Sequence, residues 1–230
     1  MALSKRKKEF SKLADKKKSY TLREAIEVLK QAPKTKFDQT VEISFKLNVN
    51  IKETSVSVRG TVSLPHGTGK TRKVAVFCKG EDEKKAKTAG ADFVGADELV
   101  KKVSEGWCDF DVAIATPDMM KDMGRLGKVL GPRGLMPNPK AGTVTANVEK
   151  AVEEVKKGKI EFKMDKQSNI HAMIGKLSFE TKALFENGSE LIECVERSKP
   201  HTVKGVFLKN MSISSTMGPG LRLDIANWQK

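Results

Sequence analysis

The sequence predicts two domains: an outer, split α+β sandwich built from both chain ends, and a Rossmann-like parallel α/β domain inserted between them. Residues 40–50 alternate between apolar and polar side chains, which is typical of a strand with one buried face. The alternation returns at residues 160–164, after a middle part in which short apolar runs alternate with helical patterns. Strands that alternate with helices favour a parallel sheet. We therefore assign residues 1–66 and 160–230 to the outer domain and 67–159 to the inserted one.

The chain begins with a basic tail and an amphipathic helix. Residues 1–18 contain eight Lys or Arg and two acidic residues, which is typical of a solvated tail or of an arm that follows phosphate groups. Thr21 to Glu24 form a capping-box pattern, and Pro33 is expected to stop the helix. One helical face carries the side chains expected in the core, namely Leu22, Ala25, Ile26 and Leu29.

A long half-buried strand is predicted at residues 40–50, and a second strand at about 56–64. The period of two separates the side chains of the first strand into two faces. The expected buried set is Val41, Ile43, Phe45, Leu47 and Val49. The expected exposed set is Thr40, Glu42, Ser44, Lys46 and Asn48.

The inserted domain is predicted as alternating strands and helices. In chain order we expect a strand at 73–78, a helix at 81–89, an apolar run at Phe93-Val94, a helix at 96–104, a strand at 112–115, helical residues after Thr116, and a helix at 147–157 capped by Asn147. Short apolar runs joined by helices favour strands that are buried in a parallel layer.

After the inserted domain, the sequence predicts a hairpin and a long helix. Strands 160–164 and 169–174 are expected to pair across the turn Lys166-Gln167-Ser168. A helix over 181–198 would place Leu184, Leu191 and Val195 inward. Asn187-Gly188 within this helix disfavours an unbroken helical run. Two strands, near 203–208 and 211–215, are expected to follow.

The charge indicates a polyanionic partner. The net charge is +14 and the sequence pI is about 9.6, which favours nucleic acid over an anionic membrane. Aromatic residues make up only 6% of the chain, and no basic helix with bulky apolar residues suits a membrane surface. Residues 67–159 contain 18 Lys or Arg and 14 Asp or Glu, so most of the net charge lies in the outer domain.

The cysteines and the hydropathy pattern indicate the cellular compartment of the protein. Cys78, Cys108 and Cys194 form no C-x-x-C pair, which disfavours a zinc cluster or a disulfide framework. The sequence contains no apolar run of about 18 residues. We therefore expect a cytoplasmic protein that binds no metal.

Gly69-Lys70-Thr71 resembles the end of a phosphate-binding loop and raises the alternative of a nucleotide-binding enzyme with a basic surface. That loop requires glycine where this chain has Leu64, and a helix directly after the motif. Residues 72–77 predict a strand instead, which disfavours the enzyme. The glycines are then expected to form a hinge between the domains, made of Pro65, Gly67, Gly69 and, on the return connection, Gly158.

The most unusual stretch is the glycine- and proline-rich run from Met123 to Gly142. Its cations, together with backbone N–H groups, suit phosphate binding. A structured surface loop with turn-forming prolines explains the composition equally well. The cations are Arg125, Lys128, Arg133 and Lys140.

Two other segments suit RNA. Lys36-Phe37, Thr40 and Glu42 place a cation, an aromatic ring and hydrogen-bonding groups at the start of the first strand, which suits a stacked base and sugar hydroxyls. On these residues alone, a plain solvated sheet face is the favoured alternative. Ser212 to Pro219 end a strand in hydroxyls and a Met-Gly-Pro turn, which admits an RNA backbone or simply forms a polar turn.

The histidines indicate no catalytic site. His66, His171 and His201 stand in no metal-binding or nucleophile-activating pattern, so we expect no catalytic residue and no cofactor. His171 is interpreted as a surface residue within reach of RNA.

Four motifs resemble the L-one family of bacterial large-subunit ribosomal proteins, and the similarity extends from about residue 4 to 225. They are Lys36 to Glu42, Val58 to Gly67, Leu130 to Lys140, and Thr216 to Pro219. The resemblance implies a non-enzymatic protein of two domains, monomeric when free. It also implies binding to large-subunit ribosomal RNA, in a mobile stalk beside the exit site for tRNA, whose movement accompanies release of deacylated tRNA. Bacterial members of the family also bind their own operon mRNA and repress its translation.

The resemblance implies RNA contacts from three separate segments of the outer domain, which strengthens the functional interpretation of Phe37, Thr40 and Glu42. The expected contacts are Lys36, Phe37, Thr40, Glu42, Lys46, Lys163, Asp165, Lys166, Ser168, His171, Ser212, Thr216, Met217 and Gly218. Lesser contacts with RNA or tRNA are expected from Arg125, Lys128, Arg133 and Lys140. Asn187-Gly188 departs from the family pattern and puts the continuity of its helix in question.

Overall fold

The computed structural model describes residues 8–10, 13–15, 18–33, 35–49, 58–200, 203 and 205–228. The chain divides into two compact units: unit 1 is Met1–Gly69 with Ile160–Lys230, and unit 2 is Lys70–Lys159. Unit 1 has a five-stranded and a two-stranded sheet around one hydrophobic core, and unit 2 has a three-stranded sheet with a core on each face. The predicted mixture of an α+β and a parallel α/β part is confirmed. Part of the expected basic tail, the start of the strand expected at 56–64, and His201 lie outside the described residues.

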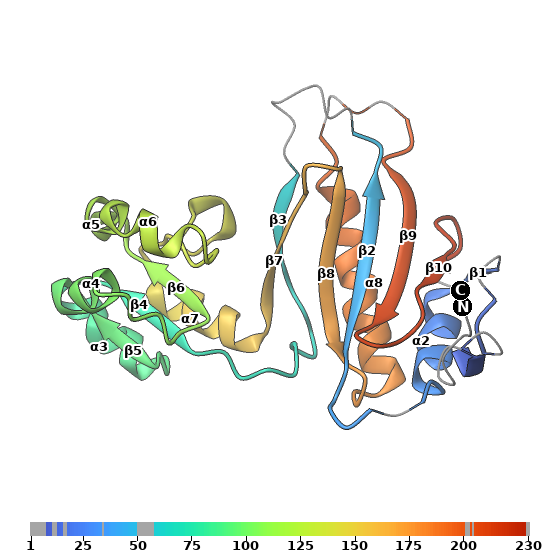
Figure 1. Cartoon of the computed structure of the whole chain (residues 1–230). Coiled ribbons are helices and arrows are strands. Elements are labelled where there is room, and N and C mark those ends of the chain that lie inside the picture. The colour runs from blue at the N-terminus through green and yellow to red at the C-terminus, as the bar shows by residue number, and fades with distance from the viewer. Residues whose placement is uncertain are drawn as a thin grey trace. The chain divides into compact units, whose positions relative to one another are not determined.

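Unit 1 is built on a five-stranded sheet (Figure 1). Its strand order is β1 (Ser19–Tyr20), β10 (Leu221–Leu223), β9 (Leu208–Ser215), β2 (Thr40–Leu47) and β8 (Asn169–Lys176). The strand β2 pairs antiparallel with both β8 and β9, whereas β1 and β10 pair in parallel. The alternation that predicted β2 therefore belongs to a strand with neighbours on both sides.

Two helices cover one face of this sheet, α2 (Leu22–Lys30) and α8 (Thr181–Arg197). The expected capping box is present at the start of α2, where Thr21 and Glu24 exchange hydrogen bonds. Figure 1 shows α8 behind the central strands. The side chains predicted for the core are confirmed as buried, namely Leu22, Ala25, Ile26 and Leu29 of α2 and Val41, Ile43, Phe45 and Leu47 of β2.

The helix predicted over 181–198 is confirmed as α8, which runs unbroken through Asn187-Gly188 although this pair disfavours a helix. A Cβ atom at Gly188 would lie 3.1 Å from Leu22 and 3.5 Å from Ile43. Glycine therefore lets α8 pack closely against both α2 and β2, and this packing outweighs the low helix propensity of glycine, about 1 kcal/mol. Asn187 is buried beside it.

Strand pairing differs from the prediction in two places. The expected hairpin is wrong, because β7 (Lys159–Lys163) pairs with β3 (Arg59–Ser63) in a two-stranded sheet, while β8 joins β2. An ion pair between Arg59 and Glu161 joins β3 and β7. The strand expected near 211–215 is confirmed as part of β9, which spans Leu208–Ser215. The separate strand expected near 203–208 is wrong, because the described residues before Leu208 form no strand.

Unit 2 contains a parallel sheet in the order β5 (Phe93–Gly95), β4 (Val74–Phe77) and β6 (Val112–Ala115). Its helices are α3 (Glu81–Thr88), α4 (Asp97–Ser104), η1 (Pro117–Met119), α5 (Met120–Arg125), α6 (Gly127–Leu130), η2 (Pro139–Ala141) and α7 (Val148–Lys157). Ala75 and Phe77 of β4 pack into one core, and Val74 and Val76 into another. Both faces of this sheet are therefore covered, as expected for a buried parallel layer.

Two predictions in unit 2 have clear outcomes. Asn147 caps α7 as expected, because its side chain accepts a hydrogen bond from the N–H group of Lys150 at 3.3 Å. The Met123–Gly142 run is less irregular than expected, because α5 and α6 contain most of its first eight residues and η2 lies near its end. Met123, Leu126 and Leu130 are buried in a core, which explains the helical form.

Candidate nucleic-acid interface

The face of the five-stranded sheet opposite α2 and α8 is polar. We call the following three rows of paired residues the polar face. Ser44 of β2 lies between His171 of β8 and Ser212 of β9. The other rows place Glu42 between Met173 and Ser214, and Lys46 between Asn169 and Asn210. Three strands that are distant in sequence thus present donors, acceptors and a cation on one surface.

The middle of the polar face forms an open hollow of about 280 Å³. Its walls are Ser44, Phe45, Lys46, Asn169, His171, Asn210 and Ser212. Ser44 Oγ lies 3.0 Å from His171 Nδ1, and Lys46 Nζ donates to the carbonyl oxygen of Gln167. These contacts orient the side chains that the sequence assigned to RNA binding in this part of the sheet.

The N-terminal end of β2, at Thr40, is joined to the turn that follows β9; we call this the first end of the strand. The N–H group of Thr40 donates to Thr216 Oγ1 at 3.0 Å, and the N–H group of Thr216 donates to the carbonyl of Thr40 at 3.0 Å. Lys176 Nζ donates to Thr40 Oγ1 at 3.1 Å. The hydroxyls of Thr40 and Thr216 therefore have fixed positions at one end of the polar face.

Two large apolar side chains are exposed at this first end. Phe37 is 53% exposed and Met217 is 52% exposed. Gln39 helps to hold the two segments together, because its side chain is buried and its Oε1 accepts a hydrogen bond from the N–H group of Met217 at 3.0 Å. Asp38 accepts from the hydroxyl of Ser178 at 2.7 Å and fixes the same segment. An exposed aromatic ring on an ordered backbone is suited to stacking.

The second end of β2 lies beside the turn between β7 and β8, and Asp165 organises this turn. Its carboxylate accepts from the N–H groups of Asn169 and Gln167, each at 2.7 Å, and from Asn169 Nδ2 at 3.0 Å. These hydrogen bonds, first that from the N–H group of Asn169, hold the pKa of Asp165 below its ordinary value. Lys163, Asp165 and Lys166 are exposed around the turn.

Ser168 differs from the other predicted contacts, because its side chain is only 1% exposed. Its hydroxyl donates to the carbonyl of Val49 at 3.2 Å, and its own carbonyl accepts from Leu47 at 2.8 Å. It is also the only described non-glycine residue with a positive φ, at 60°. Ser168 therefore holds the turn against β2, and its direct contact with RNA stays a prediction.

The structure thus brings the predicted contacts of unit 1 onto the two ends and the polar face of one sheet. The ends are separated by the length of β2, seven steps of about 3.3 Å or roughly 23 Å. Of the predicted residues, Lys36, Phe37, Thr216, Met217 and Gly218 lie at the first end. Arg125, Lys128, Arg133 and Lys140 are exposed in unit 2 and form no ion pair within the described part of the chain.

Sequence reasoning missed residues that only the pairing brings to this surface. Arg222 of β10 lies beside Ser212, and Asn210 shares the exposed side of β9 with Ser212. The strand β10 has three residues, too few for a periodic pattern. Gln39 and Ser178 were also missed, because their role depends on contacts with distant segments.

No cluster that could hold a metal ion occurs among the residues the structure describes. Within the same residues, none of the helices is both long and apolar enough to cross a membrane. Gly69-Lys70-Thr71 leads into the strand β4 and not into a helix, as the sequence predicted. The geometry required of a phosphate-binding loop is therefore missing at this motif.

Comparison with known proteins relates most of the chain to one family. Residues 28–219 match the model of the ribosomal protein L1p/L10e family. The chain is 56% identical to the large ribosomal subunit protein uL1 of Protochlamydia amoebophila over 222 residues, which are 96% of this chain and 94% of that protein. It is 53% identical to the large ribosomal subunit protein uL1 of Kosmotoga olearia over 221 residues, 96% of each chain.

Proposed function

The chain belongs to the ribosomal protein L1p/L10e family, and from this premise we propose that unit 1 binds large-subunit ribosomal RNA. The relatives at 56% and 53% identity are named as large-subunit proteins, and a family of ribosomal proteins is not one of enzymes. The single observation that supports a specific surface is the polar face, with Phe37 and Met217 exposed at one end of it. The protein then acts at the ribosome, in the cytoplasm.

Recognition by this surface depends mainly on shape and hydroxyl contacts. The Thr216 hydroxyl is held by the backbone of Thr40, and the Thr40 hydroxyl accepts a hydrogen bond from Lys176 Nζ, so little order must be gained on binding. Glu42 can accept hydrogen bonds from ribose 2′-hydroxyls, and Phe37 can stack on a base. Exposed lysines at both ends add a phosphate-binding contribution that depends on salt.

We further propose that the protein forms a mobile stalk near the tRNA exit site and assists the release of deacylated tRNA. The exposed cations of unit 2, Arg125, Lys128, Arg133 and Lys140, provide a basic surface for a second RNA contact. We also propose that the polar face binds the operon mRNA of this protein and represses its translation. One surface then serves two RNAs of similar shape.

Filter binding with a fragment of large-subunit ribosomal RNA tests the main proposal. Met217→Asp and Thr216→Val are each expected to weaken binding by about 1–3 kcal/mol, the scale of one good contact. Met217→Leu is the matched control and keeps near-wild-type affinity. Lys182→Ala, on the helix that covers the opposite face, is the control for general charge. Wild-type affinity in the folded Met217→Asp and Thr216→Val variants would contradict the proposal.

The repressor proposal needs its own test. A reporter gene behind the leader of this protein's operon is expressed with the wild-type protein or with Met217→Asp. Repression is expected with the wild type and with Met217→Leu, and its loss with Met217→Asp. Equal reporter output in all three cases would remove the repressor role and leave ribosomal RNA binding intact.

A further inference from the structure

The connection that leaves unit 1 after β3 contains two glycines with positive φ, Gly67 at 68° and Gly69 at 71°. Such glycines, with Pro65 before them, led us to expect a flexible hinge at this point. The structure gives the glycines another reason. A left-handed backbone is required there to bring the segment 64–69 against the helix α8 and the end of the strand β8.

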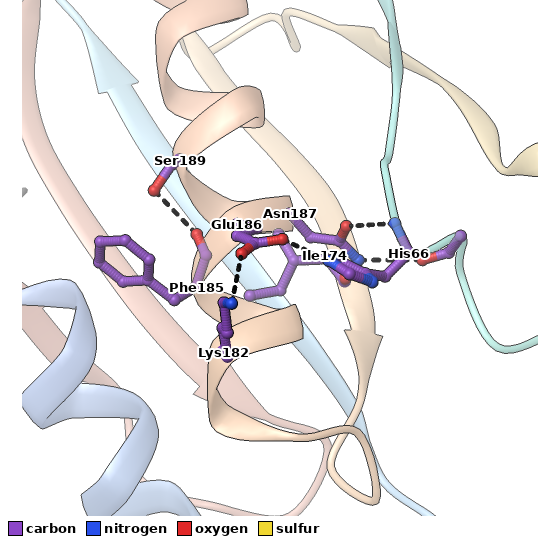
Figure 2. Close-up of polar contacts among 8 residues, drawn as sticks. His66, Ile174, Lys182, Phe185, Glu186, Asn187 and Ser189 are labelled. Carbon is purple, nitrogen blue, oxygen red and sulfur yellow. Dashed lines mark hydrogen bonds and ion pairs between the residues drawn. The ribbon is translucent and has the colours of Figure 1, made fainter.

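Asn187 is the centre of this arrangement (Figure 2). Its side chain is fully buried in the middle of α8. Its Oδ1 accepts from the N–H group of His66 at 3.0 Å, and its Nδ2 donates to the carbonyls of Gly67 at 3.0 Å and Ile174 at 2.7 Å. One amide therefore ties together a helix, an edge strand and the connection. A buried amide is tolerated when it is satisfied in this way.

Neighbouring contacts extend the attachment along the connection. The ring of His66 contacts the carboxylate of Glu186, which also pairs with Lys182 at 4.0 Å. Thr68 is 3% exposed. A Cβ atom at Gly69 would lie 2.9 Å from Lys176 and 3.0 Å from the ring of Phe179, so only glycine fits there. Residues 66–69 are thus held by unit 1 on several sides.

The next attached residue belongs to unit 2. The N–H group of Lys73 donates to Asp111 at 2.9 Å, and the side chain of Lys73 pairs with Asp109 at 3.0 Å. In the part of the chain that the structure describes, Lys70, Thr71 and Arg72 make no hydrogen bond and no ion pair within 4 Å. Lys70 and Thr71 are exposed, whereas Arg72 is half-buried and interacts electrostatically with Asp111 of unit 2. Only these three residues lie between two attached segments.

The return connection is shorter still. Gly158 caps α7 with φ 106° and donates to the carbonyl of Val155 at 3.2 Å. The strand β7 begins at the next residue, Lys159, whose Nζ pairs with Glu154 at 2.7 Å. This connection therefore offers one residue, Gly158, for a change of direction.

We propose that Asn187 is a latch that fixes residues 66–69 to unit 1 and confines motion of the first connection to Lys70, Thr71 and Arg72. The point of motion on this connection is then at residues 70–72, after Gly67 and Gly69, where the sequence predicted the hinge. Within the Gly69-Lys70-Thr71 motif, Gly69 ends the segment that is fixed to unit 1, and Lys70 begins the segment that can move. With Gly158 on the return connection, the latch limits how freely the two units can reorient.

Backbone ¹⁵N relaxation of the full-length protein without RNA tests the latch. In the wild type, residues 66–69 are expected to be as rigid as β8, with order parameters near about 0.85, and residues 70–72 to fall below about 0.6. In Asn187→Ala, residues 66–69 are expected to fall to the level of 70–72 while β8 and α8 stay rigid. Residual dipolar couplings are expected to report a wider range of orientations between the units in this variant.

Ser189→Ala is the matched control, because its hydroxyl donates only to Phe185 of the same helix at 2.8 Å (Figure 2). It is expected to leave residues 66–69 rigid. The proposal is overturned if residues 66–69 of the wild type are as mobile as 70–72, a result that needs no variant. It is also overturned if they stay rigid in folded Asn187→Ala. Because no RNA is present, these outcomes are independent of the proposed RNA binding.

Discussion

The sheets of the two units are covered differently, and their strands differ accordingly, because β2 alternates polar and apolar residues whereas β4 is wholly apolar. The three-stranded sheet of unit 2 has a core on each face, and all four residues of β4 are buried. The five-stranded sheet of unit 1 has helices on one face, and β2 alternates between buried and accessible residues along its length. A sheet with a free face can offer a fixed pattern of side chains to a ligand. In unit 2, by contrast, any contact must come from helices and turns, where Arg125 and Arg133 lie.

The largest expected effect is the loss of stability when a buried phenylalanine is removed from the core of one unit or the other. Phe45 of β2 and Phe77 of β4 are both buried, so replacing either by alanine should cost its own unit about 3–5 kcal/mol of unfolding free energy. Phe45→Ala should also weaken RNA binding, because it loosens the sheet behind the polar face. Phe77→Ala should leave the affinity of unit 1 near the wild-type value.

The two tryptophans allow this measurement, because Trp228 packs in the core of unit 1 and Trp107 against a core of unit 2. Urea unfolding is followed by fluorescence in Trp107→Phe and Trp228→Phe backgrounds, so that each unit is seen separately. If both alanine variants lowered RNA affinity equally, the comparison between the units would fail.

The second prediction concerns charge. Replacing Lys36, Lys46, Lys163 and Lys166 together by alanine should reduce the salt dependence of RNA binding by up to about 0.7–0.9 per lost phosphate contact in the logarithmic plot. The matched variant replaces Arg125, Lys128, Arg133 and Lys140, which removes the same charge from unit 2. It should change the slope for the same RNA fragment much less. Equal slopes in the two variants would indicate a general polyanion binder.

The third prediction concerns the turn at the second end of β2. The pKa of Asp165 is lower in the folded protein, so its contribution to stability is present above its unfolded pKa of about 3.9 and is lost as pH falls through the folded pKa. Urea unfolding between pH 3 and 6 should therefore show a smaller loss of stability on acidification in Asp165→Asn than in the wild type. Parallel curves for the two proteins would show that this carboxylate does not stabilise the turn.

The sequence was sufficient where local patterns decide the structure. The period of two in β2 predicted which residues are buried, and the capping box predicted the start of α2. It was insufficient where distant segments decide. One example is the pairing of β7 with β3. Another is the hydrogen bonding of Asn187 to His66 and Ile174, in which His66 lies 121 residues from Asn187. Asn187-Gly188 disfavours a helix when the sequence is considered alone, because the packing and hydrogen bonds that favour this pair come from distant segments.

The smallest expected effect again separates the two sheets. Ser215, at the end of β9, is 4% exposed, and its hydroxyl is the only buried side-chain polar atom of the described residues that has no hydrogen-bond partner. It lies beneath Gly218, whose added Cβ would be 2.1 Å from this oxygen. The described residues of unit 2 include no buried side-chain polar atom without a hydrogen-bond partner. The first end of the polar face is therefore less than optimal for stability, as binding sites often are.

Ser215→Ala should accordingly stabilise unit 1 by a few tenths to about 1 kcal/mol, because it removes an unsatisfied polar group without changing the packing of the backbone. The Trp228 signal in urea unfolding measures this gain, and RNA affinity should stay within about twofold of the wild type. Ser212→Ala, on the polar side of the same strand, is the control and should leave stability within about 0.5 kcal/mol. A clear loss of stability in Ser215→Ala would mean that its hydroxyl has a partner, such as a bound water, and that both sheets are equally satisfied inside.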